Sequence, residues 1–467
     1  MIWKHLWPPS RDLALFSLAF GVRIIPWLWG ATHWDRILQS TDSHGYHQAA
    51  VNLLAHGTLS VSFTPPFAPD SLRTPVYPWF LAAVYGLFGV RPALAQCVIA
   101  SSSVLLVDRI ATRLVGRRAA LVAAILLALD LPSLALSMML LTETLAVFLL
   151  LAASLFIVNL YPPPGPGGAT PDPTGRVDAP RGPAWTGVVV GLLLAACALT
   201  RPTFLFLPGV VWIALLPRRN LRAVVTCFLL LVLSFSLPLA AWMVRNRVSV
   251  GVWEFSSIQG QELLFYRVSG VMARVWAVPV AEAWARLDRE SRQEVQQRGL
   301  GPAHLDRIRN EIGRRYLRAH PLEYVPVMAS GMVKAWVGLS IFDLLKQFDL
   351  WYRGVGLFGS GGGAERTMRE RWAALSAGEQ LAIGFEVIYR LIVLALGSLG
   401  LVLVVIRRDG ATLALVVPHL SYISLTCGTV LAYHRFRAPL VPYWCILAGV
   451  GLSWLAALWT HELERGR

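Results

Sequence analysis

The sequence predicts an all-α polytopic membrane protein with about ten transmembrane helices and surface-lying helices in two large extracytoplasmic loops. Its 467 residues are 55% hydrophobic and only 15% charged, with a mean hydropathy of +0.55. Apolar runs of about 17–25 residues recur along the chain, which is the length that a helix needs to cross the hydrocarbon core. A soluble protein of this length could not cover so much apolar surface.

The predicted spans follow one another through most of the chain. They cover residues 12–30, 93–113, 119–136, 142–160, 185–200, 203–217, 221–242, 381–406, 411–431 and 438–459. The first apolar run, from Leu13 to Leu28, is followed by no small-residue cleavage site. We therefore expect it to remain as the first transmembrane helix.

Clustered arginines orient these spans. They lie in short segments at 109–118, 218–222 and 407–408, which the positive-inside rule places in the cytoplasm together with both termini. The regions then expected outside are 31–92, 243–380 and the turn at 433–437. The net charge of +15 fits such loops and lipid phosphates, so nucleic acid is not an expected partner. This topology indicates a multi-pass membrane protein with two large regions outside the cytoplasm.

We expect this topology to divide the chain into three parts. Residues 1–242 form an N-terminal transmembrane catalytic module that includes the first outer loop, 31–92. Residues 243–380 form a large extracytoplasmic loop with amphipathic helices, and 381–467 form the C-terminal transmembrane helices. The stretch 161–183 is rich in Pro and Gly and predicts a flexible cytoplasmic linker.

The outer regions contain their own helical patterns. Residues 42–56 have apolar side chains at helical spacing and end at Gly57, which predicts a short amphipathic helix capped by Ser40 or Thr41. Residues 76–90 are apolar but too short for a span, which favours a helix along the membrane surface. Further helices are predicted at 281–298, 303–318 and 322–340, and a flexible stretch at 359–363.

Two carboxylates are candidates for chemistry on the outer face. Asp42 begins the helix 42–56, with Tyr46 one turn later, and Glu143 begins the span 142–160. Each has a plain structural alternative, since an acid in the first turn of a helix is often only a cap. Two acids on one membrane face can also divide the tasks of proton acceptor and positioning group. We predict that both line one cavity.

Arginines at outer helix ends form a second candidate group. They are Arg201, Arg245, Arg435 and Arg437. Positive charge on the outer side departs from the positive-inside trend, and an arginine fork matches two phosphate oxygens at once. The alternative is that these side chains only reach toward lipid headgroups. We favour a clamp for a donor phosphate, because separate helix ends would converge on one face.

No metal or cofactor is expected from the sequence. The ten histidines show no ligand spacing within a helix, although His44, His47 and His434 lie on the predicted outer face. The five cysteines are scattered one per span, which is typical of small buried residues. No glycine-rich phosphate loop of a nucleotide enzyme is present.

Several short motifs follow one another along the chain. They are Asp42 with Tyr46, Asn52-Leu53 with Gly57, Arg73-Thr74-Pro75-Val76-Tyr77-Pro78, Leu141-Thr142-Glu143, Leu199-Thr200-Arg201-Pro202, Trp242 with Arg245-Asn246, and Arg435-Phe436-Arg437-Ala438-Pro439. In this order they resemble the GT-C superfamily of membrane glycosyltransferases, and the closest branch is the bacterial group similar to dolichyl-phosphate-mannose protein mannosyltransferases and to the lipid A aminoarabinose transferase. This resemblance implies a multi-pass protein of the bacterial cytoplasmic (inner) membrane, with its active site facing the periplasm. The chain departs from many relatives at Ser43, where they carry a second acid.

The resemblance implies a GT-C-like bundle and an inverting glycosyltransferase. The donor would be a polyprenyl-phosphate-linked sugar, and the acceptor a lipid, glycan or protein at the extracytoplasmic membrane face. Asp42 matches the catalytic acidic position and Glu143 a second acidic position. The four arginines would bind the donor phosphate. The supporting residues would be Tyr46, Arg73, Tyr77 and His434.

Two other functions remain open at this point. A transporter or flippase of lipid-linked sugars would suit the many spans, but the long outer loops with surface helices and the lack of paired broken-helix repeats disfavour it. A ligase or polymerase that takes a glycan from a lipid diphosphate would release a different lipid product. Donor consumption separates the first alternative from a transferase, and the released lipid separates the second.

Overall fold

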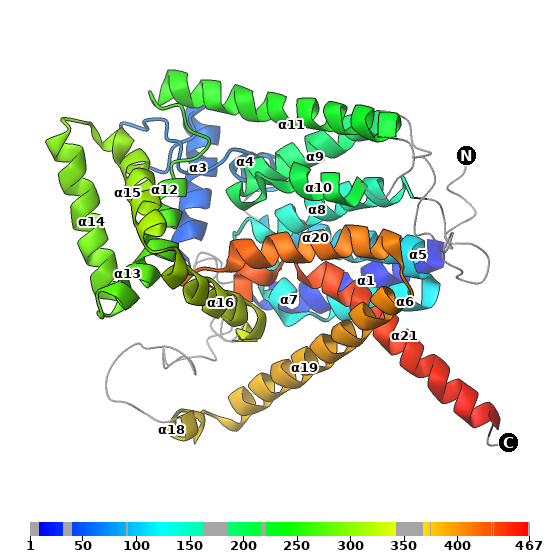
Figure 1. The fold of residues 1–467 in the computed structure, drawn as a ribbon. Coiled ribbons are helices and arrows are strands. Elements are labelled where there is room, and N and C mark those ends of the chain that lie inside the picture. The colour runs from blue at the N-terminus through cyan, green and yellow to red at the C-terminus, as the bar shows by residue number, and fades with distance from the viewer. Residues whose placement is uncertain are drawn as a thin grey trace.

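The fold is described by a computed structural model that covers residues 9–30, 40–89, 92–161, 185–215, 221–341, 368–373, 375–430, 432 and 434–465. Within these ranges the chain is helical and contains no strand (Figure 1). The helices divide into a bundle and a cluster of loop helices at one end of it. The predicted all-α architecture is therefore confirmed.

The apolar segments form the bundle. Its helices are α1 (Pro9–Gly30), α5 (Pro92–Val115), α6 (Arg117–Ala128), α7 (Leu131–Met138), α8 (Glu143–Val158), α9 (Trp185–Thr200), α10 (Leu207–Leu215), α11 (Leu221–Ser249), α19 (Ala377–Ile406), α20 (Gly410–Cys427) and α21 (Val441–Arg465). A short helix, η2 (Pro202–Phe204), joins α9 to α10. Every predicted span coincides with one of these helices or with a consecutive pair.

Fewer helices than the ten predicted have the length and composition of a full span. Among the described residues, five are long and apolar enough to cross a membrane, or up to seven if each of two bent helix pairs is one span. The predicted span 119–136 is one such pair, bent by 51° between α6 and α7. The bend occurs because Asp130 caps a new helix there, with its side chain accepting a hydrogen bond from the Ser133 backbone N–H.

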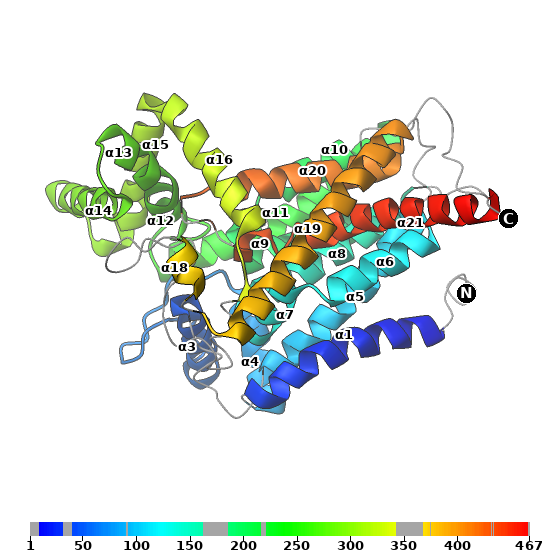
Figure 2. The ribbon, with the colours of Figure 1, turned by 90° about the horizontal axis from the view of Figure 1, so that it is seen from below.

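The loop helices gather at the end of the bundle opposite the start of α1 and the end of α21 (Figures 1 and 2). They are α3 (Thr41–His56), α4 (Val76–Phe88), α12 (Gln259–Gln261), η3 (Glu262–Val268), α13 (Ser269–Val275), α14 (Val280–Gln297), η4 (Pro302–His304), α15 (Leu305–Ala319) and α16 (Pro321–Val337). The second bent pair, 259–275 with 280–297, turns through 112° inside this cluster, so we assign it to the loops. The short helix α18 (Met368–Ala373) precedes α19.

The first outer helix, α3, forms as its sequence predicts. The Ser40 side chain caps it by accepting from the Ser43 backbone N–H, and Gly57 ends it in the left-handed conformation at φ 65°. Asn52 on its buried face donates to the carbonyl oxygens of Ser60 and Ser62, at 2.8 Å each. These bonds hold the following loop against α3.

The large outer loop folds around its own small apolar core. Ile308 and Ile312 on α15, the helix predicted at 303–318, are fully buried against η3, α13 and α14. The predicted helices 281–298 and 322–340 correspond to α14 and α16. The glycine-rich stretch 359–363, and all but the first residue of the linker 161–183, lie outside the described residues.

Glycines allow α19 and α21 to approach each other closely. A Cβ atom on Gly400 would lie 1.8 Å from the carbonyl oxygen of Leu447, and one on Gly451 would lie 2.3 Å from that of Leu396. Small residues at such crossings let helix backbones pack by direct van der Waals contact.

We expect Gly400→Val to lower the melting temperature of the purified protein, because the valine forces α19 and α21 apart. Overpacking of this kind typically costs about 1–3 kcal/mol. Thermal unfolding in detergent measures the change. The matched control is Gly384→Val in the same helix, where a Cβ atom meets nothing within 4 Å. An equal loss in both variants would contradict this account of the crossing.

Candidate active site

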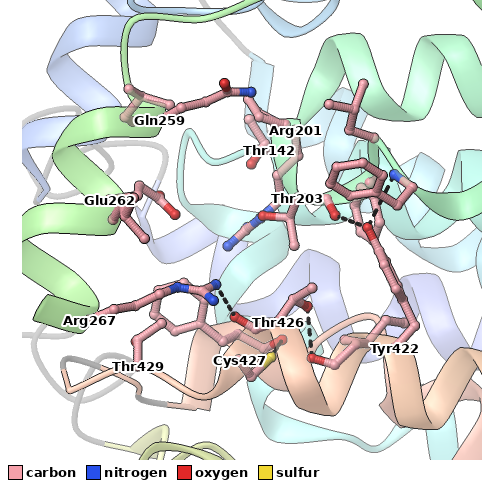
Figure 3. A pocket seen from close by; sticks show the side chains of 18 of the residues that line it. Thr142, Arg201, Thr203, Gln259, Glu262, Arg267, Tyr422, Thr426, Cys427 and Thr429 are labelled. Atoms are coloured by element: carbon pink, nitrogen blue, oxygen red, sulfur yellow. Dashed lines mark hydrogen bonds between the residues drawn. The ribbon is translucent and has the colours of Figure 1, made fainter. Parts of the chain in front are cut away.

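A cavity of about 750 Å³ lies where the bundle meets the loop helices. Its walls come from α3, the α9–α10 connection, η3, α15, α20 and the short helix η5 (His434–Arg437). These elements are far apart in the sequence, so the cavity exists only in the folded chain. Figure 3 shows side chains from several of them directed into one space.

Asp42 lies on one wall of the cavity between two arginines. Its Oδ1 accepts from Arg73 and its Oδ2 from Arg435, both at 2.8 Å. The Arg73 guanidinium also lies over the Tyr46 ring, 4.5 Å from the ring centroid. Gly45 gives Arg73 room, since a Cβ atom there would lie 3.2 Å from its Nη2. Both carboxylate oxygens of Asp42 are therefore occupied.

Glu143 is only 1% exposed and lies directly behind the cavity without lining it. The prediction that both acids line one cavity is therefore wrong for Glu143. Its Oε1 accepts from Arg201 Nη1 and from Arg435 Nε. Arg435 thus joins the two carboxylates that the sequence singled out, and Arg201 and Arg435 face the cavity in front of Glu143. A buried carboxylate between two guanidinium groups fixes their positions, because separating them would leave charges without partners.

The two arginines make Asp42 a weak proton acceptor. Burial is the largest single influence and raises its pKa, but the combined charges and hydrogen bonds of Arg435 and Arg73 lower the pKa to about 2. A base with so low a pKa has little driving force to take a proton from an acceptor group at neutral pH.

This pairing predicts an acid-dependent loss of stability. The pKa of Asp42 is lower in the folded chain than its ordinary value of 3.8. Its contribution is therefore fully present above about pH 4 and is lost as the pH falls toward about 2. We expect the melting temperature of the wild type to fall more steeply over this window than that of Asp42→Asn. Parallel curves for the two proteins would contradict the ion pairing of Asp42.

Arg245 and Arg437 do not line the cavity, although the sequence grouped them with Arg201 and Arg435. Arg245 donates to the carbonyl oxygen of Asp70 at 2.6 Å, which ties α11 to the first outer loop. Arg437 is 4% exposed and donates to backbone carbonyl groups at the end of α16. Only two of the four arginines are therefore placed to meet a ligand in this cavity.

Of the four residues predicted to support the site, two line the cavity and two do not. Tyr46 and Arg73 line the cavity. Tyr77 is fully buried behind Tyr46, with the two ring centroids 4.9 Å apart, and donates to the side chain of Gln96. His434 is buried at the start of η5 and does not line the cavity.

The cavity also contains charged residues that the sequence analysis did not single out. They are Glu262 and Arg267 on η3, and Arg314 and Arg318 one turn apart on α15. Arg267 is held by hydrogen bonds to the Tyr324 hydroxyl and the Thr426 carbonyl oxygen, at 3.0 and 3.3 Å. In the sequence, the only feature that marks Glu262 is its position directly before the apolar run 263–266.

One wall of the cavity is apolar and comes from the bundle. It is formed by Leu205 and Phe206 before α10 and by Tyr422 and Ile423 on α20. Phe206 is 71% exposed, so this wall continues onto the outer surface of the bundle. The Tyr422 hydroxyl ties α20 to η2 by donating to the Thr203 carbonyl oxygen at 2.5 Å (Figure 3). The cavity is thus charged on one side and apolar on the other.

The chain matches no protein-family model and no curated protein in sequence. Its structure is similar to the archaeal oligosaccharyltransferase AglB from Archaeoglobus fulgidus in complex with an inhibitory peptide and a dolichol-phosphate, with a TM-score of 0.53 and 12% identity. The apo form of the Archaeoglobus fulgidus oligosaccharyltransferase gives a TM-score of 0.52 and 14% identity. The chain shares the fold of these oligosaccharyltransferase chains.

Both comparisons cover 100% of this chain but only 52% and 53% of the oligosaccharyltransferase chains, so it spans about half their length. A weaker match is ArnT from Cupriavidus metallidurans bound to undecaprenyl phosphate, with a TM-score of 0.35, 13% identity, and coverage of 95% of this chain and 76% of ArnT. At such identities the likeness concerns the fold.

The described part of the chain offers no group of three or more His, Cys, Asp or Glu side chains that could hold a metal ion. Its five cysteines all lie among the described residues and are buried, as their scattered positions predicted. What the cavity offers instead is positive charge supplied by arginines, which can neutralise the charge of a phosphate group.

Proposed function

We propose that the chain is an inverting glycosyltransferase that moves a sugar from a polyprenyl-phosphate donor to an acceptor at the extracytoplasmic membrane face. One observation carries the proposal: a single cavity combines an ion-paired arginine group with an apolar wall that reaches the surface of the bundle. A lipid-linked sugar has the same division, with a charged phosphate between a polar sugar and a hydrocarbon chain. The bacterial inner membrane and its periplasmic face remain part of the proposal.

In this proposal Arg201 and Arg435 bind the donor phosphate. Their guanidinium groups line the cavity and are held from behind by Glu143. Positive charge fixed before the reaction stabilises the negative charge that develops on the leaving phosphate without further rearrangement. The apolar wall at Phe206 and Tyr422 receives the first part of the hydrocarbon chain.

The reaction is a single displacement. An acceptor oxygen or nitrogen forms a bond to the anomeric carbon, and the bond from that carbon to the phosphate oxygen breaks. The electron pair leaves with the lipid phosphate, a monoester whose second pKa of about 6 lets it depart without an acid. The acceptor proton passes to a base. Attack from the opposite side inverts the anomeric centre.

A second candidate donor is favoured by one further observation. Arg267, Arg314 and Arg318 add a second group of positive charge to the cavity wall. Among the described residues, Arg314 and Arg318 have no hydrogen-bond or ion-pair partner. A lipid diphosphate carries a second phosphate that such a group could neutralise. Of the two alternative functions, this second group of positive charge favours a ligase or polymerase over a flippase.

Two measurements test the proposal. In the first, polyprenyl phosphate is added to the purified full chain, with neutral polyprenol of the same length as the control. We expect the phosphate alone to raise the melting temperature, because only the folded cavity binds it. An equal shift with both lipids, or none, would contradict a phosphate site. This measurement needs no acceptor.

In the second, the full chain is incubated with polyprenyl-phosphate and polyprenyl-diphosphate sugars and a panel of membrane lipid, glycan and protein acceptors. Release of polyprenyl phosphate supports the monosaccharide transferase, and release of polyprenyl diphosphate supports the ligase. A donor that crosses the bilayer of proteoliposomes unchanged identifies a flippase and overturns the transferase.

A further inference from the structure

Two acidic side chains line the cavity, and of these only Glu262 has no ion-pair partner among the described residues. It is the first residue of η3, a turn of π-helix between α12 and α13. It lines the cavity, and in Figure 3 its carboxyl group points toward the space enclosed by the labelled side chains. Single π-helical turns are rare and are frequent at functional sites.

Its surroundings differ from those of the two acids that the sequence singled out. Asp42 and Glu143 are each held by two guanidinium groups. Among the described residues, no donor lies within hydrogen-bonding or ion-pairing distance of the Glu262 carboxylate. Its oxygens therefore remain available to a molecule in the cavity.

The chain holds this turn in place from the other side. Asp306 on α15 accepts hydrogen bonds from the backbone N–H groups of Gly260 and Gln261, at 2.9 Å each. A Cβ atom on Gly260 would lie 2.0 Å from the Asp306 carbonyl oxygen, so the glycine permits this close approach. Glu262 thus stands on a fixed backbone although its own side chain makes no bond.

We propose that Glu262 accepts the proton of the acceptor group during glycosyl transfer. This inference rests on the proposed function. As the acceptor oxygen or nitrogen bonds to the anomeric carbon, its proton moves to a carboxylate oxygen of Glu262. The lipid phosphate departs with the electron pair of the broken bond, and the proton later leaves with bulk water. Asp42 then has the role of holding Arg73 and Arg435 toward the phosphate.

The basicities of the two acids support this division of roles. Burial raises the pKa of Glu262 above its ordinary value, and the charges of Arg201 and Arg267 offset this only in part. A general base works best when its pKa approaches the working pH, which favours Glu262 over a carboxylate with a pKa near 2.

Glu262→Gln tests the proposal in the full chain with the donor and acceptor that the wild type uses. We expect turnover to fall by about 100-fold or more, which is the usual contribution of a positioned base. The melting-temperature shift caused by polyprenyl phosphate should stay within the wild-type range, because the arginine group is intact. The acidic limb of the pH–rate profile should disappear. The control Glu282→Gln changes an exposed acid on α14 that pairs with Arg286 outside the cavity.

A second variant separates a proton acceptor from a structural group. Glu262→Ala leaves space for a small carboxylate, so added formate should restore part of the lost turnover. Turnover of Glu262→Gln within threefold of the wild type, or a retained acidic limb, would overturn the inference while leaving the transferase intact. A wild type that consumes no lipid-linked donor in the full panel would instead count against the proposed function.

Discussion

Replacing Arg435 with methionine is expected to lower turnover about 100- to 1000-fold, the range typical of removing one preorganised group that stabilises developing charge. Arg435 donates to both Asp42 and Glu143 and lines the cavity. Its loss removes positive charge from the proposed phosphate site and leaves Asp42 with one arginine. We therefore expect the affinity for polyprenyl phosphate to fall together with turnover.

The measurement is turnover number and KM with the lipid-linked donor, alongside the polyprenyl phosphate shift in melting temperature. Arg435→Lys should lie between the wild type and the methionine variant, since lysine keeps the charge but lacks the fork that reaches two carboxylates. Arg274→Met is the matched control, because Arg274 is exposed and pairs with Glu323 away from the cavity. Wild-type turnover in Arg435→Met would remove this residue from the site.

The sequence predicted the acids and arginines at the outer helix ends but not their partners. Apolar runs bounded by loop charges place helix ends on one side of a membrane, and that was enough to select Glu143, Arg201 and Arg435. Their ion pairs join residues 58 and 292 positions apart. Which ends of a bundle meet depends on helix order and rotation, which a hydrophobic pattern does not specify.

The same limit explains the two arginines that lie elsewhere. Arg437 follows Arg435 by two residues in a short 3-10 helix, and the two side chains leave it on different sides. Arg245 points back to the first outer loop, because the Asp70 carbonyl oxygen accepts its hydrogen bond. A position near a helix end specifies the membrane face of a residue, but the direction of its side chain depends on local turn geometry.

The sequence pattern did not indicate Glu262, for a different reason. It lies in a long loop whose many acids pair on the surface, as Glu282, Glu290 and Glu294 do. Only the π-helical turn and its contact with α15 separate it from them. In the sequence all of these acids look alike, as charged residues of a long polar loop. Only the tertiary contacts show which of them lies in the cavity.

Removal of the Glu143 charge is expected to have the largest effect on stability. Glu143 is 1% exposed, and Glu143→Gln leaves Arg201 without the carboxylate that neutralises it. Breaking a buried ion pair by changing one partner costs about 3–5 kcal/mol, because the remaining charge stays buried without compensation. We expect a large fall in melting temperature and no measurable transfer from this variant.

The double variant Glu143→Gln with Arg201→Met then distinguishes a structural role from a functional one. Removing Arg201 as well takes away one uncompensated charge, so part of the lost stability should return, with a coupling between the two sites above about 0.5 kcal/mol. Transfer should not return, since Arg201 would no longer bind the phosphate. The coupling is measured from the melting temperatures of four proteins: the wild type, both single variants and the double variant. Their turnover shows whether transfer returns. Additive stability losses would show that the pair is not coupled, and recovered transfer would exclude Arg201 from the phosphate site.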